Sequence, residues 1–322
     1  VDTGVFELID RDGRAGNIEA LKAGLADRAR GMLPALVEEQ RKRVHADIDY
    51  EELLQLCSDM RGHTSKLPDA GIEEKLGRVD WENDDILLFV GRLISSKGLQ
   101  SIVAALPSIL ATHSRARLIV TGHGPLRPVM EVFIWALANG AHGLVRNIVA
   151  WGCALEGAAA TPFEELRLFF DDLEARGELF SYFETARRVL EPDRVIFTGY
   201  LTHAELKYLM PCCDVAIFPS VVAEAGPLVL LEALASGCFP LGTYFAGMAA
   251  HIDSVSAGLP AGDAALMRLS NDRSRTIRDI IANTNGALTL GGRHKQTLRQ
   301  AVEEQYDWTA AARSLSAEFS HL

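Results

Sequence analysis

The sequence contains few cysteines, and their arrangement argues against a disulfide framework or a zinc site. There are five, an odd number, and no two have the C-x-x-C spacing that is typical of a structural metal site. Reduced thiols in a cytoplasmic protein are the expectation. The five positions are Cys57, Cys153, Cys212, Cys213 and Cys238.

Basic residues are also scarce relative to acidic ones. The chain has 32 Lys and Arg residues and 43 Asp and Glu residues, so the net charge is −11 and the isoelectric point is near 5.3. This balance argues against a nucleic-acid partner and against a polybasic membrane anchor. We recognise no signal peptide and no apolar run that reaches the length of a transmembrane segment. An anionic ligand would therefore need a local concentration of positive charge.

Short, wholly apolar runs alternate with helical patterns from residue 85 onward. Because these runs lack polar alternation, they predict strands buried on both faces, hence a parallel sheet covered by helices. With 322 residues, 48% of them hydrophobic, the chain can bury such a core. The expected strands are 86–90, 117–121, 194–198, 214–218 and 239–243, and the expected helices are 99–111, 126–138, 204–210 and 227–235. This is the pattern of an α/β protein with a doubly wound, Rossmann-like sheet, in which ligands bind at the carboxyl ends of the strands.

Three other segments flank or interrupt this pattern. Residues 1–84 have helical spacing and are expected to form a helical N-terminal segment. Residues 85–290 would form the Rossmann-like domain, and residues 140–192 read as a helical insertion with helices at 163–175 and 179–190. Residues 291–322 would hold a C-terminal helix, expected at 303–319. The aromatic stripes of the insertion are more typical of core or interface than of a binding site.

Two D-x-D triplets occur near the N-terminus, at residues 10–12 and 47–49. Neither follows a buried strand, so we interpret both as surface charge and predict no metal site. The run Gly122-His123-Gly124 lacks the third glycine of a dinucleotide motif, because Arg127 stands in its place. His123 is therefore expected to be a loop histidine.

The stretch 214–237 carries the most informative pattern, DVAIFPSVVAEAGPLVLLEALASG. Its two glutamates, Glu224 and Glu232, are separated by seven residues, and a helix is expected to start between them. A helix N-terminus offers free N–H groups and the positive end of a dipole, which suit a diphosphate. Other short matches follow in order: FVGRL with KG (89–93 and 97–98), LIVTGHGP (118–125), VIFTGYL (195–201) and YDW (306–308).

Taken together, these pieces resemble the donor-binding half of a family-four retaining glycosyltransferase of the GT-B fold. The resemblance implies metal-independent transfer of a hexose from a nucleotide diphosphate sugar, with a UDP-sugar favoured, and no cofactor. Glu224 would be the catalytic residue, holding the sugar and steadying charge at the anomeric carbon. The donor-binding residues would be Arg92 and Lys97 at the phosphates, Glu232 at the ribose, Tyr200 and Leu201 at the base, and Gly226, Pro227 and Leu228 at the helix start.

The sequence departs from the family pattern at this helix start. The family usually has Glu-x-x-Gly, whereas here the run is Glu224-Ala225-Gly226-Pro227. Pro227 suits the first position of a helix but has no N–H, so one backbone donor is lost. Farther on, Ala246-Gly247 matches a small loop near the donor sugar, without the acidic residue that often follows.

The chain opens on VDTGVF, which resembles the turn by which members of the family enter their second domain. The expectation is an excised donor half whose missing partner is an N-terminal acceptor domain, and which is inactive alone. Two alternatives remain open. One is a non-catalytic nucleotide-binding module. The other is a different GT-B enzyme, such as a sugar-nucleotide epimerase or a phosphorylase, although the cofactor-lysine motif of phosphorylases is absent and epimerases lack the paired glutamates.

Overall fold

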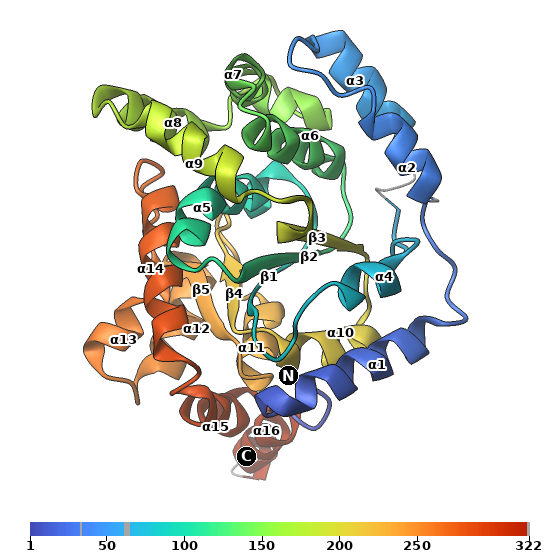
Figure 1. Ribbon diagram of the computed structural model, residues 1–322. Helices are drawn as coiled ribbons and strands as arrows, with labels where there is room; N and C mark the ends of the chain where they lie inside the picture. The colour runs from blue at the N-terminus through green and yellow to red at the C-terminus, as the bar shows by residue number, and fades with distance from the viewer. Residues whose placement is uncertain (33, 61–64, 321–322) are drawn as a thin grey trace.

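A parallel β-sheet forms the centre of the computed structural model, which describes residues 1–32, 34–60 and 65–320. Its six strands lie in the order β3-β2-β1-β4-β5-β6. The chain winds outward from β1 in one direction and from β4 in the other, so the strand order reverses between these two strands (Figure 1). The predicted fold class, a doubly wound α/β sheet, is confirmed.

The strand predictions are confirmed to within a residue at each end. The strands are β1 (Asp85–Val90), β2 (Ala116–Thr121), β3 (Val195–Gly199), β4 (Val215–Phe218), β5 (Phe239–Thr243) and β6 (Arg268–Leu269). The residues of β4 and β5 are all buried, as wholly apolar strands covered on both faces require. Strand β6 was not predicted, because two residues, one of them an exposed arginine, give no apolar run.

Helices cover both faces of the sheet. Helix α5 (Leu99–Thr112) packs on α9 (Leu179–Val189) and α14 (Thr276–Leu290), and α14 contacts β4 and β5. On the other face α11 (Leu228–Ala235) contacts β4, β5 and α15 (Lys295–Tyr306), while α10 (His203–Leu209) packs on α1 (Arg14–Leu25) (Figure 1). Among the described residues, no helix is both long enough and apolar enough to cross a membrane.

The segment 140–192 adds a helical layer beside α5 and α6 (Leu126–Ala138) (Figure 1). It contains α7 (His142–Trp151), the 3-10 helix η4 (Gly152–Glu156), α8 (Glu164–Ala175) and α9, so both predicted helices are confirmed. Its aromatic side chains pack together and Tyr182 donates a hydrogen bond to the carbonyl of Ala104 in α5 (2.8 Å). The aromatic stripes are therefore core.

The N-terminal segment is helical, as predicted, and packs into the same hydrophobic core as the sheet. Its helices are α1, α2 (Pro34–Arg41), α3 (Tyr50–Asp59) and α4 (Ile72–Gly77). Two buried arginines fix it in place: Arg14 pairs with Asp214 before β4, and Arg127 of α6 forms a bidentate pair with Asp69 (2.6 Å for both bonds). The division of the chain into domains stays a prediction.

The C-terminal part differs from the prediction of one helix over 303–319. After α12 (Ala246–Ser256), α13 (Ala261–Ala265) and α14, the chain forms α15 and α16 (Trp308–Ser320). They are separate because Asp307 has an extended backbone, and its carboxylate accepts hydrogen bonds from the N–H groups of Thr309 (2.7 Å) and Thr3 (3.1 Å). A new helix does begin at Trp308, where the YDW motif placed one.

Candidate functional site

A cavity of about 330 Å³ lies at the carboxyl ends of β1, β2 and β3, beside the first turn of α11. Five of the predicted site residues line it: Arg92, Tyr200, Leu201, Leu228 and Glu232. Sequence reasoning did not assign its other polar lining residues, which are Thr121, His123, Thr202 and His203. Ligands of doubly wound sheets bind at this edge, next to the reversal of strand order. We call this space the donor cavity, after the ligand that the sequence predicts at this edge.

The loops after β1 and β2 touch each other through their backbones. A side chain on Gly122 would place its Cβ 1.8 Å from the carbonyl oxygen of Gly91, so only glycine fits there. The N–H of Leu93 also donates to the carbonyl of His123 (2.8 Å). This junction holds Arg92 and His123 on the cavity wall. Arg92 is exposed, and no carboxylate among the described residues pairs with its guanidinium.

Tyr200 and Leu201 lie where β3 ends, as predicted. The N–H of Tyr200 donates to the carbonyl of Leu67 (2.9 Å), so this group is not available to a base. The ring of His123 packs edge-on against the Tyr200 ring, with centroids 5.4 Å apart. His123 is thus a loop histidine that also forms part of the cavity wall. The Tyr200 N–H is therefore engaged within the fold, and the assignment of the base to Tyr200 and Leu201 stays a prediction.

Glu232 lies one turn into α11, and its side chain is only 10% exposed. Burial raises the pKa of its carboxyl above the ordinary value, although His203, with Nε2 at 3.1 Å, works in the opposite direction. His203 could have been suspected from the sequence, because it directly follows Thr202, which caps α10 just past a strand end.

The start of α11 is an open helix N-terminus. Pro227 has extended backbone angles and is the N-cap residue, so the prediction that it would be the first helical residue is wrong by one position. It makes no side-chain cap, and no described residue accepts a hydrogen bond from the N–H of Leu228 or Val229. These two donors and the helix dipole favour an anion at the cavity wall.

Lys97 and Glu224 form an ion pair with each other, and neither is among the residues that line the donor cavity. Ser220 also donates a hydrogen bond to the Glu224 carboxylate (2.6 Å). Burial raises the pKa of Glu224, but the hydrogen bonds from Lys97 and Ser220 and the Lys97 charge outweigh it, so the pKa lies below its ordinary value. The expected pair of cations, Arg92 with Lys97, is therefore not a free pair, because Lys97 is held by Glu224.

The loop from Glu224 to Gly226 rests on the start of α12. The carbonyl of Glu224 accepts a hydrogen bond from the N–H of Gly247 (2.9 Å), which brings the predicted small loop to this place. A Cβ on Gly226 would lie 3.2 Å from Cε1 of His251. Burial lowers the pKa of His251, and its Nδ1 atom is buried with no partner among the described residues. The match at Ala246-Gly247 pointed to this region, but the contact between His251 and Gly226 follows only from the fold.

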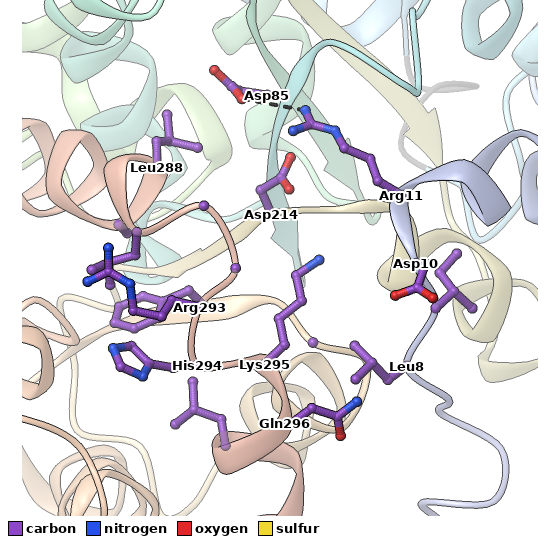
Figure 2. A pocket seen from close by; sticks show the side chains of 18 of the residues that line it. Leu8, Asp10, Arg11, Asp85, Asp214, Leu288, Arg293, His294, Lys295 and Gln296 are labelled. Atoms are coloured by element: carbon purple, nitrogen blue, oxygen red, sulfur yellow. Dashed lines mark ion pairs between the residues drawn. The ribbon is translucent and has the colours of Figure 1, made fainter.

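A second cavity, of about 360 Å³, opens at the opposite edge of the sheet (Figure 2). Its lining includes Asp85, Asp214 and Phe239 at the amino ends of β1, β4 and β5, together with residues between α14 and α15. Two ion pairs form within it: Arg14 Nη2 lies 2.5 Å from Asp214 Oδ1, and Arg11 lies 3.6 Å from Asp85. It contains none of the predicted site residues. The donor cavity is therefore the candidate functional site. Within the described residues, no group of three or more His, Cys, Asp or Glu side chains could hold a metal ion.

Comparison with known proteins finds a family match within this chain. Residues 175–259 match the family described as "Glycosyl transferases group 1". This segment includes Tyr200, Leu201, Glu224 and Glu232, whereas Arg92 and Lys97 lie before it. The resemblance to a group 1 glycosyltransferase is confirmed for this segment, whereas the retaining mechanism and the donor-half assignment stay predictions.

Two curated proteins that this chain resembles are named as glycosyltransferases. An uncharacterized glycosyltransferase of Methanocaldococcus jannaschii is 26% identical over 156 residues, covering 48% of this chain and 26% of the relative. The 2-deoxystreptamine N-acetyl-D-glucosaminyltransferase of Streptomyces fradiae is 33% identical over 115 residues, covering 35% and 24%. The chain thus matches about a quarter of the length of each curated relative. Among solved structures, Anabaena HepE in complex with UDP-glucose aligns with a TM-score of 0.46 at 15% identity, covering 78% of this chain and 52% of that chain.

Proposed function

We propose that this chain is the donor-binding part of a retaining glycosyltransferase that moves a hexose from a nucleotide diphosphate sugar, with a UDP-sugar favoured, to an acceptor hydroxyl. One arrangement carries the proposal: the guanidinium of Arg92, which pairs with no carboxylate of the described residues, lines one cavity with the open first turn of α11 and the shielded carboxylate of Glu232. Hydrogen-bond donors for an anion and an acceptor for hydroxyls are what a nucleoside diphosphate requires.

The spacing along α11 fits the two parts of such a ligand. Leu228 and Glu232 are one helical turn apart, or about 6 Å at 1.5 Å per residue. A diphosphate at the N–H groups of Leu228 and Val229 would leave the ribose hydroxyls near Glu232. Arg92 would approach the phosphates from the β1 side, and a guanidinium matches phosphate oxygens as a fork. The base would lie toward Leu201 and the ring of His123.

The transferred sugar would then lie toward Lys97 and Glu224. In the reaction, the bond between the anomeric carbon and the phosphate oxygen breaks, and the acceptor oxygen forms the new bond with the anomeric configuration kept. The acceptor proton passes to the departing nucleoside diphosphate. Glu224, ionised because its pKa is lowered, would bind sugar hydroxyls and stabilise positive charge at the anomeric carbon. Arg92, Lys97 and the α11 dipole would stabilise the leaving phosphate without a metal ion or a cofactor.

The acceptor site would belong to a partner N-terminal domain, as in two-domain GT-B enzymes, and reaction would take place in the cytoplasm. Without that domain, this chain would bind the donor but catalyse the transfer poorly. A second candidate, a nucleotide-binding module without catalysis, is favoured by two observations. Pro227 supplies no N–H at the helix start, and Glu224 already has two partners. Such a module would bind the nucleotide and ignore the sugar.

Calorimetry separates these candidates. The chain is titrated with UDP, GDP and ADP and with their hexose conjugates, each with and without EDTA. Binding of at least one nucleoside diphosphate in EDTA, with a different affinity for its sugar conjugate, is the expected result. Equal affinity for UDP and every UDP-hexose would favour the module. Absence of binding to all three nucleoside diphosphates would refute both candidates.

A further inference from the structure

One piece of the helical segment 140–192 reaches the loop that carries Arg92 and Lys97. Most of the segment packs on α5, α6 and α14, away from the donor cavity. The exception is η4, whose last residue, Glu156, contacts Ser95. Ser95 lies between the two basic residues, at the start of the 3-10 turn η3 (Ser95–Lys97).

Glu156 binds this turn with both carboxylate oxygens. Oε2 accepts a hydrogen bond from the Ser95 N–H (2.9 Å), and Oε1 accepts one from the Ser95 hydroxyl. The preceding residue, Ile94, provides no side-chain cap for the turn, so Glu156 supplies the cap from a distant part of the chain. Ser95 is 8% exposed, which shields both bonds from water. Cys153 of the same 3-10 helix adds a contact, with Sγ 3.4 Å from Ser95 Oγ.

The turn that Glu156 holds is also fixed to the loop after β4. The carbonyl of Ser96 accepts a hydrogen bond from the N–H of Val221 (2.9 Å), and Lys97 pairs with Glu224. Gly98 follows with a left-handed backbone, and a Cβ there would lie 2.0 Å from the carbonyl oxygen of Pro219. A shift of the turn would therefore displace Lys97 from its contact with Glu224.

The support for Glu156 is itself firmly folded. Gly152, at the start of η4, has a positive φ of 51°, and a Cβ there would lie 2.1 Å from the carbonyl oxygen of Thr161. The N–H of Cys153 donates to that same carbonyl (2.8 Å), and the N–H of Phe163 donates to Val149 (3.0 Å). These bonds anchor the loop between α7 and α8, so Glu156 presents its carboxylate from a fixed position.

We propose that Glu156 is a positioning residue for the donor phosphates, through which the segment 140–192 holds the Arg92–Lys97 loop in its binding geometry. The inference rests on the proposed function, since it requires that these two cations bind phosphate. Glu156 does not itself touch the donor. Its carboxylate is anionic, so a direct contact with a diphosphate would be repulsive, and its contribution is the orientation of the turn.

Calorimetry with UDP tests this role in four variants. Glu156→Ala is expected to lower the affinity about tenfold, the equivalent of one charge-assisted hydrogen bond. Glu156→Gln keeps an acceptor oxygen and should stay within about threefold of the parent, and Ser95→Ala, which keeps the backbone bond, should fall between them. Glu178→Ala is the matched control, because this exposed glutamate lies in the same segment and makes no side-chain cap. If UDP is not a ligand, the nucleoside diphosphate that the parent binds replaces it.

A purely structural role predicts a different pattern. Urea unfolding of each variant measures stability, and saturation-transfer NMR with uridine measures binding without phosphates. The inference requires that Glu156→Ala weakens UDP binding while uridine binding stays unchanged. Equal UDP affinity in Glu156→Ala and the parent overturns it, as does higher affinity in the variant, which would mean that the carboxylate acts by repulsion. Failure of the parent chain to bind any nucleoside diphosphate would instead refute the proposed function.

Discussion

Replacing Glu232 tests the donor cavity most directly, because it is the one acidic residue among the described residues that line this cavity. Glu232→Ala should weaken binding of UDP and of UDP-sugars alike, since both carry a ribose. Hydrogen bonds to a charged group contribute about 1.5–3 kcal/mol each, and the Glu232 side chain is 10% exposed, so water competes little for it. The expected loss is therefore about tenfold to a hundredfold in affinity.

The pH dependence of binding makes the same test sharper. Burial raises the pKa of Glu232, so its carboxyl takes up a proton at a higher pH than an exposed glutamate. UDP affinity should be full above this raised pKa and should fall as the pH drops through it. The contribution of Glu232 to stability has the opposite sign: it is fully present below the unfolded-state pKa and is lost as the pH rises through the folded-state pKa. Protonation of Glu232 at acid pH should therefore weaken UDP binding without lowering the stability of the fold.

The assay is calorimetric titration with UDP over a pH series, with urea unfolding at the same pH values. Glu232→Gln is the matched variant, because it keeps the shape and removes the titrating group. It should bind weakly at every pH and lose the acid decline that this carboxyl causes. If Glu232→Ala binds UDP as tightly as the parent, or if the acid decline persists unchanged in Glu232→Gln, the assignment of Glu232 to the ribose is wrong.

Three further predictions concern groups around this cavity. Glu224→Ala should leave UDP binding intact and remove the extra affinity that the sugar provides, which paired UDP and UDP-sugar isotherms measure; equal loss for both ligands would contradict it. Replacing Arg92 and Lys97 together by alanine should cost about 3 kcal/mol or more of UDP binding, and Arg92→Ala alone should cost more than Lys97→Ala, because Lys97 must first leave Glu224. Asp69→Ala removes the bidentate partner of the buried Arg127 guanidinium and should lower the free energy of unfolding, measured by urea denaturation, by about 3–5 kcal/mol. A loss below about 1 kcal/mol would show that the ion pair of Arg127 with Glu131 compensates.

The residues most predictable from the sequence were those in the sheet. Apolar runs such as 86–90 and 239–243 can be satisfied only by burial on both faces, so their composition already implies parallel strands. The carboxyl ends of parallel strands meet at one edge, and this places Arg92, Tyr200 and the start of α11 together without any tertiary information. Short features were not predicted, because the two residues of β6 and the helix break at Asp307 produce no periodic pattern in the sequence.

The tertiary structure alone decided which side chains contact each other at that edge of the sheet. Periodicity reports which face of an element is buried, but the side chain that a charged group meets depends on where separate loops converge. Lys97 follows β1 and Glu224 follows β4, and they pair because these strands are neighbours in the sheet. His203 likewise reaches Glu232, and Glu156 reaches Ser95, from distant parts of the chain, and no local pattern at Glu232 or Ser95 indicates the contact. The sequence by itself determined the edge at which ligand chemistry gathers, and the fold determined which charges remain free to bind it.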